Sequence, residues 1–270
     1  QQNFSWSILK LVSIIGIKLQ NARNHIDYFK KAPELTDILK NKVVIEGLFK
    51  GMKYSKQVKT FGTSIFNKLL GTYEREITPF IKTIIKKNYK FIHDIGCAEG
   101  YYAVGLTLKT KANIIAYDID PIGRDLCRLN AICNNVNNRI EIKGEITSQD
   151  IENYSFKYKT LIICDIEGAE IDLFNTNNIK NLNHTDLLIE VHDFMFEGDS
   201  EASGKLKMLF KETHKIHSKF SISDRRKARL YIDPPLNKLT LEQRMPIISE
   251  YRPEIMEWLF LESKADLKKY

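Results

Sequence analysis

The segment YKFIHDIGCAEG, residues 89 to 100, constrains the fold of this chain more than any other. A short apolar strand runs into Asp94 and then into two glycines, Gly96 and Gly100, spaced G-x-x-x-G. Glycine lets the backbone turn sharply and approach a ligand closely, and open α/β sheets bind ligands at the carboxyl ends of their strands. The segment therefore predicts an α/β sheet with a ligand-binding turn after its first strand.

The acids around this turn indicate which ligand it accepts. Asp94 ends the strand and Glu99 lies inside the turn, so a pyrophosphate would face carboxylates, and the G-x-G-x-x-G spacing of dinucleotide sites is absent. A second strand, within residues 112 to 120, carries Asp118, where a carboxylate can accept hydrogen bonds from both ribose hydroxyls. A pocket rimmed by carboxylates favours a cationic nucleoside, and S-adenosylmethionine, with its sulfonium and ammonium groups, fits that description.

Three further segments carry a resemblance to a known family. They are DIEGAE (165 to 170), IEVHD (189 to 193) and EYRPEIMEW (250 to 258). Together with the glycine turn, over roughly residues 45 to 262, the chain resembles the class I S-adenosylmethionine-dependent methyltransferases, and within them the FkbM-like branch. The resemblance implies a Rossmann-like α/β fold, with a seven-stranded, mostly parallel sheet of order 3-2-1-4-5-7-6, helices on both faces, and S-adenosylmethionine as methyl donor.

From residue 89 onward the pattern alternates between strands and helices. We predict strands at 90–95, 112–118, 139–143, 159–165, 186–192, 215–222 and 228–232, and helices near 100–109, 121–134, 168–175 and 200–213. Residues 223–227 form only a short link, so the last two strands should pair antiparallel. We expect the chain to finish with a helical pair, LEQRMPIISE and PEIMEWLFLE.

Residues 1 to 88 are predicted to form an N-terminal helical accessory segment, followed by a methyltransferase domain at 89 to 270. Residues 4 to 40 predict two helices, and residues 43 to 54 a short hairpin or irregular strand. One helix should then follow through SIFNKLLGTYEREITPFIKTIIK. The apolar segment FSWSILKLVSIIGIKLQ is interrupted by lysines and falls short of the ~20 apolar residues of a spanning helix, so we expect no transmembrane segment.

Net charge and cysteine content give only weak information about the binding partner and the cellular compartment. The chain has 41 basic and 34 acidic residues, a net charge of +7, which favours an anionic partner, although a solvated basic face is the interpretation that we prefer on charge alone. The cysteines show no C-x-x-C spacing and predict reduced core residues and a cytoplasmic protein. They are Cys97, Cys127, Cys133 and Cys164.

The candidate donor-binding residues follow the first three strands. Gly96 and Gly100 should line the donor, with Asp94 near its amino-acid portion and Asp118 on its ribose. Asp120 precedes Pro121, a pattern typical of a helix cap. Glu145, after the third strand, is a candidate for the adenine amine, and an ordinary exposed loop acid is the alternative.

The candidate catalytic residues follow the fourth and fifth strands. Asp165 and Glu167 should lie beside the transferable methyl group, and the next strand brings Glu190 and His192 to the same edge. In one interpretation, His192 or Glu167 is a general base that removes a hydroxyl proton. In the other, Asp165, Glu190 and His192 bind a divalent cation. We prefer the metal-free base because the sequence shows no dedicated ligand spacing.

The acceptor is the least constrained part of the prediction. Basic and aromatic residues that resemble positions near the FkbM-like site are Lys53, Tyr54, Tyr73 and Arg252, with Glu190 beside them. The basic run DRRKAR (224 to 229) is interpreted as a solvated hairpin tip.

Three functions are therefore considered. The leading hypothesis is an O-methyltransferase acting on a hydroxyl of a sugar, glycan precursor or small metabolite. The alternative is an RNA or protein methyltransferase, motivated by the basic charge, although no interleaved aromatic platform for nucleic acid is present. The third is a non-catalytic interaction module on the same fold, acting through residues 1 to 40.

Overall fold

The computed structural model describes residues 28–57, 64–156, 158–193 and 201–265. The first of the two helices expected within residues 4 to 40, and the apolar segment that we did not expect to cross a membrane, lie outside the described residues. Among the residues that are described, none of the helices is long and apolar enough to span a bilayer.

One seven-stranded sheet organises the chain, with the order β3-β2-β1-β4-β5-β7-β6. The first five strands are parallel, and β7 runs antiparallel between β5 and β6. This confirms the predicted sheet order. The strands are β1 (Phe91–Ile95), β2 (Asn113–Tyr117), β3 (Ile140–Lys143), β4 (Thr160–Cys164), β5 (Thr185–Val191), β6 (His214–Phe220) and β7 (Glu257–Ser263).

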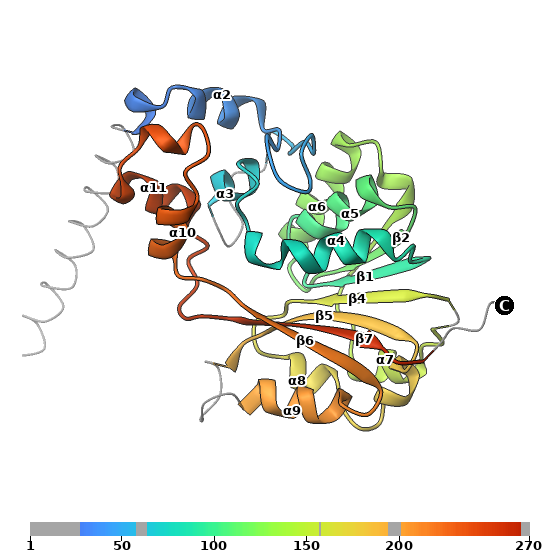
Figure 1. Cartoon of the computed structure of the whole chain (residues 1–270). Coiled ribbons are helices and arrows are strands. Elements are labelled where there is room, and N and C mark those ends of the chain that lie inside the picture. The colour runs from blue at the N-terminus through green and yellow to red at the C-terminus, as the bar shows by residue number, and fades with distance from the viewer. Residues whose placement is uncertain (1–27, 58–63, 157, 194–200, 266–270) are drawn as a thin grey trace, which may run out of the picture.

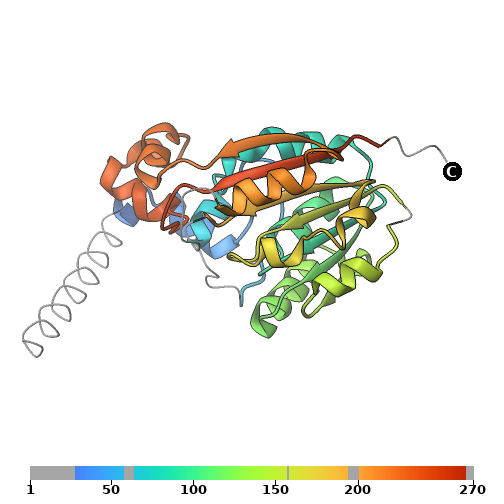
Figure 2. The same ribbon diagram turned by 90° about the horizontal axis from the view of Figure 1, so that it is seen from below.

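Helices cover both faces of this sheet, as Figure 1 shows, with α4, α5 and α6 on one face and α8 and α9 on the other. Both views place α2, α10 and α11 together beyond one end of the sheet (Figures 1 and 2). The helices are α2 (Glu34–Asn41), α3 (Ile65–Leu69), α4 (Thr78–Lys86), α5 (Tyr101–Lys109), α6 (Pro121–Cys133), α7 (Ser148–Asn153), α8 (Glu170–Leu173), α9 (Glu201–Phe210), α10 (Asp224–Leu230) and α11 (Leu241–Ile248).

The period of two along each strand divides the core into two layers. In β4, Leu161 and Ile163 belong to the cluster under α4, α5 and α6, whereas Ile162 and Cys164 belong to the cluster under α8 and α9. Successive side chains in a strand point to opposite faces, so a sheet covered on both faces is apolar throughout its central strands. Every residue of β4 and β5 is buried, as this arrangement requires.

The C-terminal third differs from the prediction in two places. Residues 228–232 were expected to be the last strand, but α10 occupies most of that segment, so the predicted hairpin is wrong. The basic run lies on α10 instead, and Arg225, Arg226 and Arg229 are exposed there. Ser223 caps α10 by accepting a hydrogen bond from the Arg226 amide, and Lys227 inside the basic run is fully buried. The last strand is instead EWLFLES, which we had assigned to a helix. A short continuous apolar run does not distinguish a buried strand from a buried helix by its periodicity.

The segment before β1 packs onto the domain rather than standing apart. The bridge between Val43 and Lys53 confirms the expected short hairpin, and the backbone amides of Lys53 and Ser55 donate to Asn134 and Asn130 at 2.9 and 2.8 Å. The long helix predicted next is interrupted, because Gly71 has φ of +68° and its backbone lies against Glu46. The boundary between residues 88 and 89 stays a prediction, and one hydrophobic cluster extends across it.

Two close contacts join the elements that surround the carboxyl edge of the sheet. The first is a backbone contact between the turn after β1 and the segment after β4. Gly96 has φ of +83°, and a Cβ placed on it would lie 1.8 Å from the Asp165 carbonyl oxygen. A side chain at this position would push the two strand ends apart.

The second contact is an ion network around Arg252. The guanidinium of Arg252 donates to Glu190 at the end of β5, to Glu74 at 2.7 Å and to Glu250 at 2.8 Å. Glu250 also pairs with the buried Lys227 of α10. The carboxylates of Glu74, Glu190 and Glu250 are at most 2% exposed, so Arg252 neutralises acids that are cut off from water and that come from three distant parts of the chain.

We expect Gly96→Ala to lower the free energy of unfolding by roughly 2–4 kcal/mol, because alanine would be strained at positive φ and would overlap the Asp165 carbonyl. The matched control is Gly204→Ala, at an exposed position of α9 where a Cβ meets nothing within 4 Å. That substitution should stabilise the protein by about 0.5–1 kcal/mol through helix propensity. Urea unfolding measures both changes, and similar values for the two variants would contradict the contact.

We expect Arg252→Met to cost about 3–5 kcal/mol, because it leaves buried carboxylates without their counterion. The control is Arg225→Met on the exposed side of α10, which should change stability by no more than about 0.5 kcal/mol. The same unfolding transition reports both variants. If the midpoint for Arg252→Met equals that of the parent, the network does not hold these segments together.

Candidate active site

A cavity of about 570 Å³ lies at the carboxyl ends of β1, β2, β3 and β4. This is the edge where the sequence predicted the donor, and the volume is in the usual range for a small-molecule site. Residues predicted for the donor that line it are Gly96, Asp118, Glu145 and Asp165. The turn after β1 and the loops after the next three strands therefore form one continuous wall.

The turn after β1 is held in a strained shape by backbone hydrogen bonds. Gly96, Ala98 and Gly100 all have positive φ, at 83°, 48° and 86°. The amides of Gly96 and Cys97 both donate to the Tyr117 carbonyl at 2.9 Å, which ties the turn to the end of β2. A Cβ on Gly100 would lie 2.6 Å from the Cys127 sulfur, so this position too has no space for a side chain.

Asp118 is fixed at the end of β2 by two backbone amides. Ala98 donates to Oδ2 at 2.7 Å and Asp120 donates to Oδ1 at 2.8 Å. Each carboxylate oxygen can accept a second hydrogen bond, so the group remains able to accept from a ligand diol. Asp120 itself accepts from the Ile122 amide at 2.8 Å and caps α6, which confirms that interpretation.

The two acids of the glycine turn have different surroundings. Asp94 is buried behind the turn, its Oδ2 has no hydrogen-bond partner among the described residues, and burial raises the pKa of its carboxyl to about 7. Glu99 forms a buried ion pair with Lys68 and does not line the cavity. Lys68 does line it, with its ammonium 4.9 Å from the centre of the Tyr73 ring. The turn thus contributes less negative charge to the cavity than the sequence suggested.

His192 lies at the centre of the acidic group beside this cavity. Its Nδ1 is 2.8 Å from Oε1 of Glu170, a carboxylate with no exposed surface. Its Nε2 is 3.6 Å from Asp165, 3.4 Å from Glu167 and 3.9 Å from Glu190. Asp165 and Glu167 line the cavity, and Glu167 is 82% exposed. The structure therefore brings together the residues that the sequence proposed for catalysis.

The protonation of this group follows from burial and charge. Burial lowers the pKa of His192, but the hydrogen bond to Glu170 and the charges of Asp165, Glu170 and Glu167 outweigh it, so the pKa lies above the ordinary 6.5. Burial, together with the charge of Asp165, raises the pKa of Glu190 well above its ordinary value despite the Arg252 pair. A raised pKa of Glu190 means that its carboxyl group keeps a proton more readily, which lessens its repulsion with the neighbouring carboxylate.

Asp165, Glu190 and His192 also meet the geometric condition for a metal site, since one ligand atom from each lies within 4.8 Å of the others. Two carboxylates and an imidazole are suitable ligands for a divalent cation. However, Glu190 already contacts the Arg252 guanidinium, which supplies positive charge at the same place. The metal-free base and the metal site both remain predictions.

The residues predicted for the acceptor are spread more widely. Tyr73 lines the cavity, whereas Lys53 and Tyr54 do not. Tyr54 is 4% exposed and packs in the core, and Lys53 contacts Asn134 at the surface through its backbone. Glu190 and Arg252 bind each other at the carboxyl edge of the sheet.

Sequence reasoning missed two residues of this site. Glu170 accepts hydrogen bonds from the amides of Ile166 and Gly168 as well as contacting His192, and it was quoted within DIEGAE without a role. The sequence feature that could have indicated its role is the position of this acid directly after the glycine-containing loop that follows a buried strand. Lys68 gave no signal, because a lysine in a short apolar helix is normally solvated.

One family model matches the chain, that of ribosomal protein L11 methyltransferase (PrmA), over residues 75–189. This is less than half of the chain, and it includes β1 to β4 and most of β5 but neither His192 nor Arg252. The chain has no match among curated protein sequences.

Similar solved structures include the O-methyltransferase from Bacillus cereus in complex with S-adenosylhomocysteine, at 12% identity over 67% of this chain and 78% of that chain, with a TM-score of 0.44. A putative O-methyltransferase from Klebsiella pneumoniae is 11% identical over 68% and 79% of the two chains, with a TM-score of 0.43. The MccD protein is 12% identical over 70% and 97%, with a TM-score of 0.43. At TM-scores below 0.5 these similarities add nothing to the assignment.

The assignment depends instead on features of the chain itself and on the family match. The sheet has the order 3-2-1-4-5-7-6 with β7 antiparallel, and a cavity lined by Gly96 and Asp118 lies at its carboxyl edge. The family model spans β1 to β4 and most of β5, and it describes a methyltransferase. The chain is therefore an S-adenosylmethionine-dependent methyltransferase with the class I fold.

Proposed function

We propose that this methyltransferase transfers the methyl group to a hydroxyl of a sugar, glycan precursor or small metabolite, as a member of the FkbM-like branch. The observation that supports this most directly is the imidazole of His192, which is oriented by Glu170 and lies next to the cavity-lining Asp165 and Glu167. A hydroxyl is a weak nucleophile until a base removes its proton, so an oriented imidazole beside the donor cavity suits an oxygen acceptor.

The donor residues have distinct roles in this proposal. Asp118 would accept hydrogen bonds from the ribose, and Glu145, which follows the neighbouring strand β3, would accept from the adenine amine. Asp94, buried behind the turn and outside the cavity wall, would act on the amino-acid portion of the donor through its charge, and the positive charge of that portion favours the ionised carboxylate. Gly96 would let the backbone approach the donor closely, and Gly100 lets the turn pack against Cys127 of α6. S-adenosylmethionine supplies the methyl group from a sulfonium centre, which becomes a neutral thioether on transfer.

The acceptor is activated by proton transfer to His192. Nε2 would take the hydroxyl proton of the acceptor, so that its oxygen could receive the methyl group that a bound donor would supply. Glu170 holds Nδ1, so Nε2 is the nitrogen that faces Asp165 and Glu167, and these carboxylates stabilise the imidazolium that results. General base catalysis of this kind contributes typically about 10²–10⁴-fold.

The family match supports a second candidate, transfer to a protein, because the matched model is named for a methyltransferase of a ribosomal protein. That match ends before His192 and therefore concerns the donor half of the site. The string DIEG follows β4 in place of the N/D-P-P-Y/F string of many amino-methylating enzymes, which favours the oxygen acceptor.

Labelled methyl donor mixed with panels of glycans, small hydroxyl metabolites, ribosomal protein and RNA tests the proposed acceptor class. We expect label in a glycan or small hydroxyl compound, as an ether that resists mild base. Label that appears only in protein or RNA would replace the proposal with the corresponding alternative.

We expect His192→Ala to lower turnover by about 10²-fold or more while donor affinity stays within a few-fold, because His192 does not line the donor cavity. Turnover of the parent enzyme should rise with pH, since the base must be neutral, and the midpoint should lie above 6.5 because the pKa of His192 is raised. Single-turnover rates and calorimetric titration with S-adenosylhomocysteine measure the two quantities.

Glu170→Gln is the companion variant. It keeps a hydrogen-bonding side chain but removes the charge that raises the pKa of His192, so the midpoint of the pH profile should move to lower pH. A profile that does not move, together with unchanged turnover in His192→Ala, would remove the imidazole from the mechanism.

A further inference from the structure

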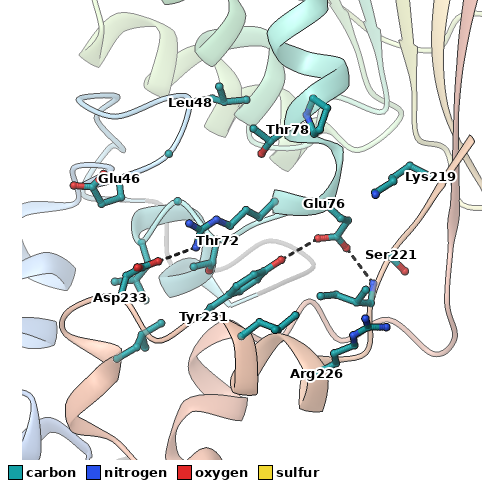
Figure 3. Close-up of a pocket in the computed structure, with 18 of the residues that line it drawn as sticks. Glu46, Leu48, Thr72, Glu76, Thr78, Lys219, Ser221, Arg226, Tyr231 and Asp233 are labelled. Carbon is teal, nitrogen blue, oxygen red and sulfur yellow. Dashed lines mark hydrogen bonds and ion pairs between the residues drawn. The ribbon is translucent and has the colours of Figure 1, made fainter. Parts of the chain in front are cut away.

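A second cavity, of about 1370 Å³, lies on the other side of residues 68–76 from the donor cavity. Lys68 and Tyr73 line the donor cavity, whereas Leu70, Thr72 and Arg75 line the second one. The rest of its wall comes from residues 45–48, from α4, from the end of β6, and from α10 with the residues that follow it to Leu236. Figure 3 labels Thr78, Lys219 and Arg226 among them. One short segment of chain therefore separates two cavities, and the methyl-transfer site uses only one of them.

The acids that line the second cavity are already neutralised. Asp233 pairs with Arg75 at 2.8 Å, Glu46 pairs with Lys50 at 2.7 Å, and Glu76 pairs with the buried Lys227 at 3.1 Å. Glu76 also accepts from the Ile222 amide and from the Tyr231 hydroxyl, which Figure 3 shows directed at its carboxylate. No lining acid among the described residues is left without a partner.

Three cations that line the cavity have no carboxylate partner in the described part of the chain. They come from three different elements: Lys82 from α4, Lys219 from β6 and Arg226 from α10. All three are exposed, so they are free to contact a ligand in the cavity. The wall thus presents three positive charges that no carboxylate among the described residues offsets.

Apolar surface accompanies these charges. Phe220 follows Lys219 directly and is 57% exposed, and Leu230, one helical turn beyond Arg226, is also 57% exposed. Both line the cavity. An organic body can therefore pack against Phe220 and Leu230 while its anionic group contacts the cations, and such burial of apolar surface is favourable.

We propose that this second cavity binds a water-soluble organic phosphate that carries at least two negative charges. Phosphate oxygens match the planar donors of an arginine and the point charge of a lysine. A cavity wall with cations from three elements can contact one small anion at several points, whereas an anionic membrane surface would require cations on a flat or convex face. The site is independent of methyl transfer, because residues 68–76 separate it from the donor cavity.

Calorimetric titration of the full-length protein with inorganic pyrophosphate, at low salt and in saturating S-adenosylhomocysteine, tests this site. We expect saturable binding that the adenosine compound does not displace. The variant Lys219→Glu with Arg226→Glu should weaken binding by about 10-fold or more, because it replaces two attractive charges by two repulsive ones.

The matched control is Lys215→Glu with Arg229→Glu. Both residues are exposed, lie on β6 and α10 like the tested pair, and do not line the cavity, so the net charge changes equally while the cavity wall stays intact. Its affinity for pyrophosphate should stay within about 2-fold of the parent value. Thermal unfolding checks that both variants fold, and Lys82→Glu provides a second reading if the double variant does not.

Three results would overturn the proposal. The first is no binding of pyrophosphate by the parent protein, and the second is equal loss of affinity in the control. The third is binding to vesicles that contain phosphatidylglycerol without binding of soluble pyrophosphate, which would assign the cations to a membrane surface. Because binding is read directly, none of these results depends on which acceptor the enzyme methylates.

Discussion

The Arg252 guanidinium is the interaction on which the arrangement around the carboxyl edge depends. It draws together Glu74 from the segment before β1, Glu190 from the end of β5 and Glu250 from the segment after α11. Water cannot screen these carboxylates, so their mutual repulsion would be large without a cation between them. Glu250 extends the network to Lys227, which in turn pairs with Glu76 on the wall of the second cavity. Buried charge therefore connects the acidic group around His192 to a surface on the far side of residues 68–76.

The predictions that held concern the parallel half of the sheet. The five parallel strands were each placed within one residue of their observed ends, because β-branched runs alternate with helices and four of the five strands are followed directly by an acid or glycine. The antiparallel half was only partly predictable. The run ending in Tyr231 and Ile232 resembles a strand, but the Ser223 cap and the burial of Lys227 against Glu76 and Glu250 favour a helix. A buried ion pair that forms across 151 and 23 residues of chain leaves no local pattern in the sequence.

The candidate site, like the fold, was predictable from the sequence only in part. Parallel strands end at one edge, so Asp118, Asp165 and His192 could be brought together from strand order alone. The partners of these residues could not. Glu170 reaches His192 because the loop after β4 turns back through Gly168, and Lys68 reaches Glu99 across a packed interface. Such contacts depend on side-chain packing between elements that are distant in the chain, and period and spacing do not report that packing.

The position of β7 has a consequence for how the chain acquires its structure. The last strand to be synthesised lies between β5 and β6 rather than at the rim. Until residues 257–263 leave the ribosome, the backbone N–H and C=O groups along one edge of β5 have no partner strand. β6 likewise has no neighbouring strand within the sheet. In a nascent chain that lacks β7, the five parallel strands can pair with one another while β6 cannot join the sheet. The exposed backbone groups of β5 and β6 are then open to binding by chaperones or by other copies of the chain.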